Sequence, residues 1–125
     1  MIDTKTLRVL STFYGRGATH DFKLLKQSKL LIPSRILARG DSGYQGIHEL
    51  HANSVIPIKH KHGQKLSPEE KRFNKKVSSE RTPVEHVIGC LKVFKILSDK
   101  YRNRRRRFSL RFNLIAGFYN AQSAL

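Results

Sequence analysis

Residues 67–97 read SPEEKRFNKKVSSERTPVEHVIGCLKVFKIL, and their pattern predicts one long helix. Ser67 is the expected N-cap, Pro68 suits the first helical position, and Glu70 completes a capping box. The helix is predicted to run to the end of the stretch, about Leu97. Pro83 is the expected position of any kink, since proline removes a backbone donor. Beyond this proline, apolar residues recur at helical spacing: Val84, Val87, Ile88, Leu91 and Phe94.

Strands and helices alternate around this long helix. We predict strands at 7–14, 36–38 and 55–58, and helices after Thr19, at 45–51 and at 108–125. This order is typical of an α/β fold. Three short strands are few for the sheet of an α/β domain, so the chain is expected to start partway into a domain.

The charge balance is the strongest compositional signal. Lysine and arginine total 25 against nine acidic residues, a formal net charge of +16. A compact body with this charge repels itself unless it meets a polyanion, and nucleic acid is the usual partner. An anionic membrane surface and a merely soluble basic protein are the alternatives. A membrane surface favours a lysine-rich amphipathic helix, whereas the densest run here is an arginine block, Arg102 with Arg104 to Arg107, which suits phosphate oxygens.

Other features of the composition argue against several classes. No apolar run approaches the length that spans a bilayer, and the first residues lack the apolar stretch of a secretory signal. We therefore expect no membrane partner and a cytoplasmic location, on the nucleoid in a prokaryote. The single cysteine, Cys90, rules out an internal disulfide and a multi-cysteine zinc site. The spacing of the six histidines does not suggest a zinc site either.

Two carboxylates occupy positions that suit chemistry. Asp41 follows a predicted strand and opens a glycine-containing turn, and carboxylates at strand ends commonly face a ligand crevice. Glu85 lies on the long helix, on a face that also carries Arg81, Gly89 and Lys92. A carboxylate between two cations suits a place where metal and phosphate meet. The plainer alternatives are a turn-shaping aspartate and a surface ion pair between Arg81 and Glu85, and spacing alone favours them.

Several segments, taken in order, resemble one known family. Residues 40–47, GDSGYQGI, look like the segment around the second catalytic aspartate of insertion-sequence transposases of the DDE superfamily, especially their Harbinger-like endonuclease group. Residues 84–92, VEHVIGCLK, resemble that group's segment around the catalytic glutamate. The likeness covers nearly the whole chain, because it continues through residues 17–22, 94–97, 101–104 and 112–117.

This resemblance implies a truncated RNase H-like α/β fold that lacks its early strands, with residues 1–125 forming part of a DDE catalytic domain. It implies that Asp41 and Glu85 are catalytic and bind divalent ions, and their hard oxygen atoms suit Mg²⁺ or Mn²⁺. The implied reaction of the full-length enzyme is DNA phosphodiester cleavage followed by strand transfer. Transposon ends and target DNA are the implied partners, and the residues expected to contact their backbone are basic: Arg81, Lys92, Lys95, Arg102, Arg104, Arg105, Arg106 and Arg107.

The chain departs from the family pattern at several points. The family's first catalytic aspartate lies upstream of the portion seen here, and neither Asp3 nor Asp21 matches its position. The usual N-terminal DNA-binding region is absent, and Cys90 stands where arginine is frequent. We therefore expect the chain alone to be catalytically incomplete, with an upstream transposase segment or a second copy of the chain as a partner.

Two other interpretations remain open at this point. The chain could be a catalytically inactive, basic DNA-binding fragment that complements or interferes with a full transposase. It could also be a basic RNA-binding protein, although it lacks the aromatic sheet motifs of common RNA-binding modules and ranks last for that reason.

Overall fold

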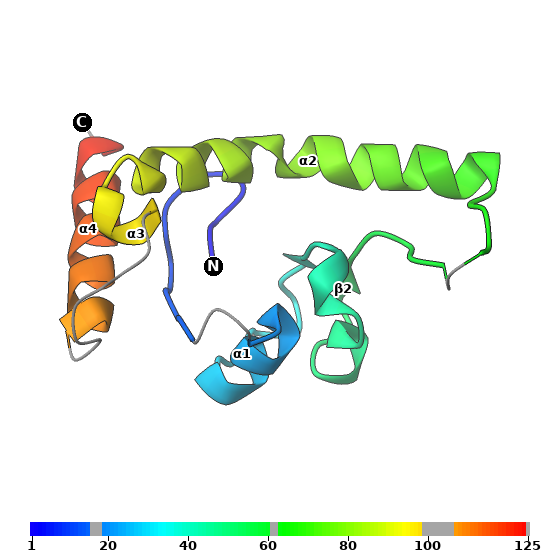
Figure 1. Cartoon of the computed structure of the whole chain (residues 1–125), viewed down its shortest axis with the longest axis horizontal. Coiled ribbons are helices and arrows are strands. Elements are labelled where there is room, and N and C mark those ends of the chain that lie inside the picture. The colour runs from blue at the N-terminus through cyan, green and yellow to red at the C-terminus, as the bar shows by residue number, and fades with distance from the viewer. Residues whose placement is uncertain (16–18, 61–62, 99–106, 125) are drawn as a thin grey trace. The chain divides into compact units, whose positions relative to one another are not determined.

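The computed structural model describes residues 1–15, 19–60, 63–98 and 107–124. The chain divides into two compact units, a terminal unit of Met1–Tyr14 with Thr82–Leu125 and a middle unit of Gly15–Arg81. Helix α2, Pro68–Lys92, belongs to the middle unit in its first part and to the terminal unit in its last part (Figure 1). Helices predominate, and the described residues contain one two-stranded parallel sheet, which is compatible with a fragment of an α/β fold.

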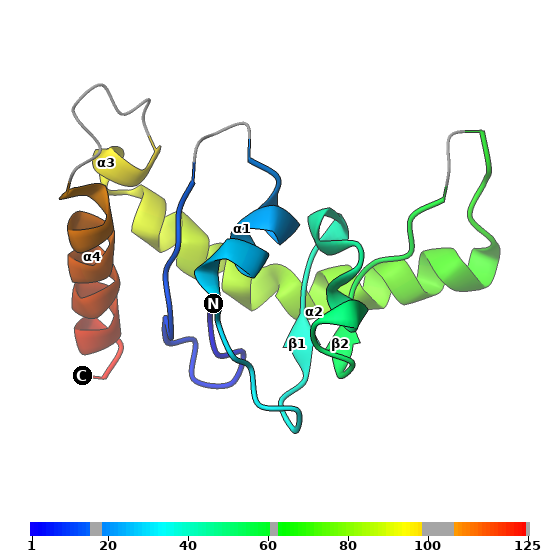
Figure 2. The same ribbon diagram turned by 90° about the horizontal axis from the view of Figure 1, so that it is seen from below.

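The middle unit contains the sheet. Strand β1, Ala38–Arg39, pairs in parallel with β2, Ser54–Val55, and Figure 2 shows the two strands side by side. Ala38 lies opposite Ser54. The other elements of this unit before α2 are one helix and two 3-10 turns: α1, Asp21–Ser28, η1, Ser42–Tyr44, and η2, Ile47–Glu49. Both β1 and β2 are shorter than the strands predicted at 36–38 and 55–58.

Two helical predictions in the middle unit were wrong in detail. The N-cap of α1 is His20, not Thr19, and its side chain makes no cap hydrogen bond. The helix expected at 45–51 is replaced by one short 3-10 turn, η2, which follows Gly46, and the φ of 91° at Gly46 is unfavourable for other residues. A Cβ at Gly46 would also lie 3.1 Å from the Phe22 ring. Backbone conformation and close packing therefore interrupt the helix here.

The start of α2 confirms the predicted capping box. The Glu70 amide donates to Ser67 Oγ at 3.2 Å, and the Ser67 amide donates to Glu70 Oε2 at 2.7 Å. The helix continues through Pro83. It ends at Lys92 rather than Leu97, because its final turn tightens into bonds spanning three residues, from Val93 and from Phe94. A separate short helix, α3, follows at Lys95–Ser98.

The terminal unit has its own hydrophobic core. Helix α4, Phe108–Gln122, packs its buried Ile115 and Ala116 with Val87 and Leu91 of α2. Val87 is fully buried. Val9, from the N-terminal segment, completes this cluster of buried residues. Of the apolar stripe predicted beyond Pro83, Val87 and Leu91 are buried in this core, whereas Ile88 and Phe94 are 38% and 47% exposed.

The strand predicted at 7–14 was wrong, since the only bridge there joins Ile2 and Val9. Side chains of α4 hold this segment instead. Asn120 accepts a hydrogen bond from the Val9 amide and donates one to the Val9 carbonyl, both at 2.8 Å. Farther along, Thr12 bonds to Asn113. An asparagine amide thus takes the place of a neighbouring strand.

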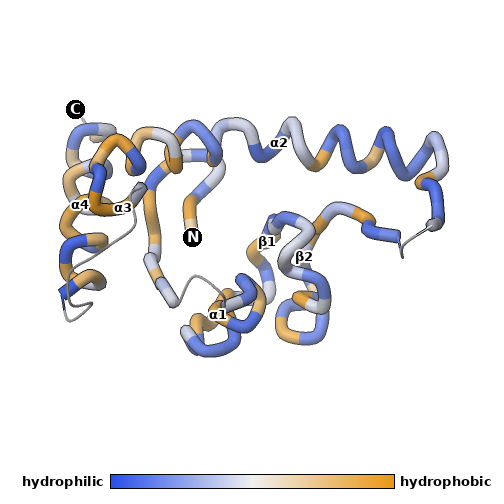
Figure 3. The backbone as a smooth tube through the Cα atoms, viewed as in Figure 1, coloured by the Kyte–Doolittle hydropathy of each residue, from blue (hydrophilic) through white to orange (hydrophobic). Residues whose placement is uncertain are grey.

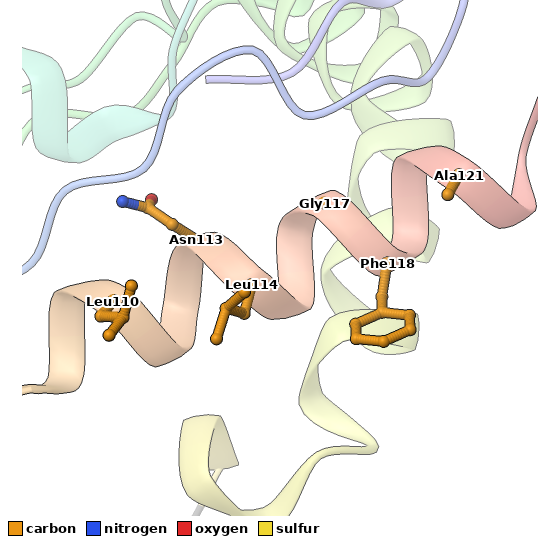
Figure 4. A pocket seen from close by; sticks show the side chains of 6 residues that line it. All are labelled: Leu110, Asn113, Leu114, Gly117, Phe118 and Ala121. Carbon is orange, nitrogen blue, oxygen red and sulfur yellow. The ribbon is translucent and has the colours of Figure 1, made fainter.

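One face of α4 is apolar and exposed. Figure 4 shows Leu110, Leu114 and Phe118 pointing to the same side of the helix, and Figure 3 shows hydrophobic residues along its length. Phe118 is 69% exposed and Leu114 is 55% exposed. Together with Asn113, Gly117 and Ala121 they line a shallow, open pocket.

Among the described residues, no helix combines the length and the apolar character needed to cross a membrane.

Candidate active site

Asp41 lies directly beyond the parallel sheet. The Gly40 amide extends the pairing by donating to the Val55 carbonyl at 3.0 Å, and this places Asp41 at the carboxyl end of β1. Asp41 Oδ1 accepts a hydrogen bond from the Gly43 amide at 2.8 Å, so the side chain caps η1. Asp41 Oδ2 lies 4.0 Å from Arg81 Nη2, and the side chain is 39% exposed. One carboxylate oxygen therefore shapes the turn, and the side chain keeps access to solvent.

A second carboxylate lies beside Asp41. A Cβ placed on Gly43 would lie 2.9 Å from Asp41 Oδ1 and 3.4 Å from Asp21 Oδ2. Tyr44 is the next residue along η1. Burial raises the pKa of the Tyr44 hydroxyl, and the negative charges of Asp21 and Asp41 raise it further. The sequence assigns Asp21 no catalytic role, because its position does not match the family's first aspartate. Its place near Asp41 depends on tertiary packing of α1 against η1.

Glu85 occupies an exposed position on α2 in the terminal unit. Gly89, one turn later, has no atom within 4 Å of the position that a Cβ would take, so this face of the helix is open. Lys92, the last residue of α2, is exposed as well. Asp41 belongs to the middle unit, and the expectation that Asp41 and Glu85 share one site stays a prediction.

The basic residues expected to contact DNA are only partly described. Arg81 is half-buried and faces Asp41 across 4.0 Å. Lys92, Lys95 and Arg107 are exposed at the end of α2, at the start of α3 and just before α4. The rest of the predicted DNA-binding set lies outside the described residues: Arg102, Arg104, Arg105 and Arg106. Their role stays a prediction.

Two histidines of the middle unit make specific contacts. His51 is buried, and its Nε2 lies 2.7 Å from the Ile36 carbonyl oxygen. His60 Nε2 lies 2.9 Å from Glu70 Oε1 of the capping box. Glu70 is the main cause of a raised pKa at His60. Within the described ranges, His, Cys, Asp and Glu side chains nowhere gather in a group of three or more that could hold a metal ion.

Comparison with known proteins identifies the family. The family model described as DDE superfamily endonuclease matches residues 3–120. The chain is also 46% identical over 125 residues to a protein of Microchaete diplosiphon named "Probable transposase for insertion sequence element IS702". That match covers the whole of this chain but 45% of the relative's length. No solved structure matches the chain. Because the family match extends over nearly all of the sequence, the chain belongs to the DDE superfamily of transposases and endonucleases.

Proposed function

We propose that this chain supplies Asp41 and Glu85 to a transposase that cuts DNA and transfers the cut strand. The observation that carries the proposal is the position of Asp41 at the carboxyl end of β1 in a chain of the DDE superfamily. In open α/β sheets, ligands bind outside the carboxyl ends of the strands. We also propose that residues 1–125 are part of an RNase H-like catalytic domain.

The donor atoms at Asp41 fit the divalent metal that this chemistry uses. Mg²⁺ and Mn²⁺ prefer carboxylate oxygens, and the Asp41 side chain is 39% exposed at the carboxyl end of β1. Glu85 would be the second carboxylate ligand, on the exposed face of α2. When bound, such ions supply the charge that activates the attacking water or 3′-hydroxyl and stabilises the leaving 3′ oxygen.

The chain's own residues have distinct parts in this proposal. The Gly43 amide fixes the orientation of the Asp41 carboxylate through its hydrogen bond to Oδ1. Arg81, 4.0 Å from Asp41 Oδ2, offsets part of the negative charge and can face a DNA phosphate. Exposed Lys92 and Lys95 would hold the DNA backbone through charge, without reading its sequence.

A chimeric transposase tests the proposal. This chain would replace the matching segment of the IS702 relative, and Mg²⁺-dependent cleavage of DNA carrying the element's ends would be measured against the unmodified relative. We expect the chimera to cleave. Asp41→Asn and Glu85→Gln should each reduce the rate by about 100-fold or more, since preorganised charge at a reacting phosphate dominates such catalysis. Glu69→Gln, at an exposed residue in the first turn of α2, is the control with the same change of charge.

Full cleavage by either the Asp41 or the Glu85 variant would show that the wrong carboxylates had been chosen. A second candidate function is a basic DNA-binding chain without cleavage activity of its own. The net charge of +16 supports it. It would be favoured if the chain binds DNA while the chimera fails to cut under conditions in which the unmodified relative is active.

A further inference from the structure

Two carboxylates from different elements lie close to Gly43. Asp21 reaches it from the first turn of α1, and Asp41 reaches it from the residue that precedes η1. Their oxygens Oδ2 and Oδ1 lie 3.4 Å and 2.9 Å from the position of a Cβ on Gly43. Burial, and after it the negative charges of Asp21 and Asp41, raise the pKa of Tyr44, which follows Gly43 in η1.

Backbone conformation does not explain the glycine at position 43. The glycines with positive φ among the described residues are Gly46 and Gly63, so a side chain at position 43 would meet no backbone penalty of that kind. A Cβ there would instead come too close to Asp41 Oδ1 and would lie 3.4 Å from Asp21 Oδ2. Glycine at position 43 therefore leaves room beside oxygens of both carboxylates.

Asp21 differs from two of the other acidic residues in the middle unit. Glu80 pairs with Arg39 at 2.9 Å, and Glu70 pairs with His60 at the same distance. Asp21 is exposed, and within the part of the chain that the structure describes its side chain, like those of Glu49 and Glu69, makes no hydrogen bond or ion pair. Its position in the first turn of α1 gives it a favourable interaction with the helix dipole. That interaction accounts for an acidic residue at the start of a helix, but not for its approach to a second carboxylate.

Two like charges held together repel each other unless a cation lies between or beside them. Arg81 faces Asp41 Oδ2 at 4.0 Å, which is longer than a hydrogen bond. A small divalent cation would neutralise both carboxylates at once and prefers oxygen ligands. The space at Gly43 is thus suited to an ion that contacts both side chains.

We propose that Asp21 is a further carboxylate ligand of the divalent cation at Asp41, and that the two residues share one ion beside Gly43. This inference rests on the proposed function, because it assigns a further ligand to the same metal site. Asp21 would then neutralise part of the ion's positive charge, and it belongs to the middle unit, as Asp41 does.

Manganese binding tests the proposal without any catalytic readout. Mn²⁺ would be titrated into the full 125-residue chain, and free Mn²⁺ would be measured by its electron paramagnetic resonance signal. Asp21→Asn and Asp41→Asn should each weaken binding by roughly tenfold or more. Gly43→Ala should also weaken it, because the new Cβ enters the space between the oxygens. Glu69→Gln should leave binding unchanged, and circular dichroism would check that each variant is folded.

A cysteine substitution separates a direct ligand from a residue that only positions its neighbours. Thiolate favours softer metals than carboxylate does. Asp21→Cys should therefore lose Mn²⁺ affinity and gain Cd²⁺ binding, with an ultraviolet sulfur-to-cadmium charge-transfer band. The unmodified chain, which already contains Cys90, provides the background.

The outcomes distinguish this inference from the proposed function. If Asp41→Asn weakens Mn²⁺ binding while Asp21→Asn behaves like the Glu69 control, the inference is overturned and the proposed function stands. Absence of the cadmium band in folded Asp21→Cys overturns a direct ligand role as well. If the chimera also cleaves DNA normally with Asp41→Asn, the proposed function itself fails.

Discussion

Replacing Asn120 with alanine should release the N-terminal segment from α4. The Asn120 amide group bonds to both the amide and the carbonyl of Val9 at 2.8 Å, and Val9 is 9% exposed. Truncation leaves a buried donor and a buried acceptor without their partner. Each such group costs about 1–3 kcal/mol, and partial access of water to the carbonyl should reduce the second cost. We expect a total loss of about 2–3 kcal/mol in the free energy of unfolding.

Urea denaturation measures this loss, with an unchanged dependence on urea concentration if the unfolded state is unaffected. Asn113→Ala is the matched control, because Asn113 lies on the same helix and bonds to Thr12 at an exposed position. It should cost at most about 1 kcal/mol. Hydrogen exchange at the Val9 amide gives a local readout, since Asn120→Ala should accelerate it selectively. Equal destabilisation by both substitutions, or unchanged exchange at Val9, would refute the reasoning.

Two further predictions concern charge. If Lys92 contacts a DNA phosphate, Lys92→Ala should make DNA affinity less dependent on salt, lowering the magnitude of the slope of log affinity against log salt concentration by about 1. Lys23→Ala should leave this slope unchanged. Equal slopes for the two variants would contradict the assignment. The His60–Glu70 pair should stabilise the chain fully between the ordinary pKa values of 4.5 for Glu70 and 6.5 for His60, because the folded state lowers the first and raises the second. This stabilisation is lost as pH rises through the raised pKa of His60, and it is also lost as pH falls through the lowered pKa of Glu70. The thermal midpoint of the unmodified chain should therefore decrease between about pH 6 and pH 8. In the His60→Ala variant this decrease should be smaller.

Local signals in the sequence predicted the helices well. The Ser67 and Glu70 capping box depends on residues three apart, and its reciprocal hydrogen bonds are present. The apolar stripe predicted beyond Pro83 contains Val87 and Leu91, which are buried, and also Ile88 and Phe94, which are exposed. Such features are predictable because a helix fixes which residues share a face before any tertiary contact forms.

Features that depend on distant partners were not predictable in the same way. The apolar, β-branched stretch at 7–14 suggested a strand, yet Asn120 provides its backbone partner from 111 residues away. Asp21 was set aside on motif position alone. Its approach to Asp41 follows from how α1 packs against η1, and no local pattern encodes that packing.

The acidic residues of the middle unit differ in how closely a cation pairs with them. In a chain with a net charge of +16, most carboxylates are expected to meet a cation. Glu80 and Glu70 do so at 2.9 Å, and those pairs join helix α2 to other parts of the middle unit. Asp41 instead meets its arginine at 4.0 Å and keeps a second carboxylate beside it, so its negative charge is less fully offset. In the proposed function, the neighbouring carboxylates would attract a divalent cation and the basic residues of the chain would attract DNA, and metal-dependent phosphodiester chemistry uses both.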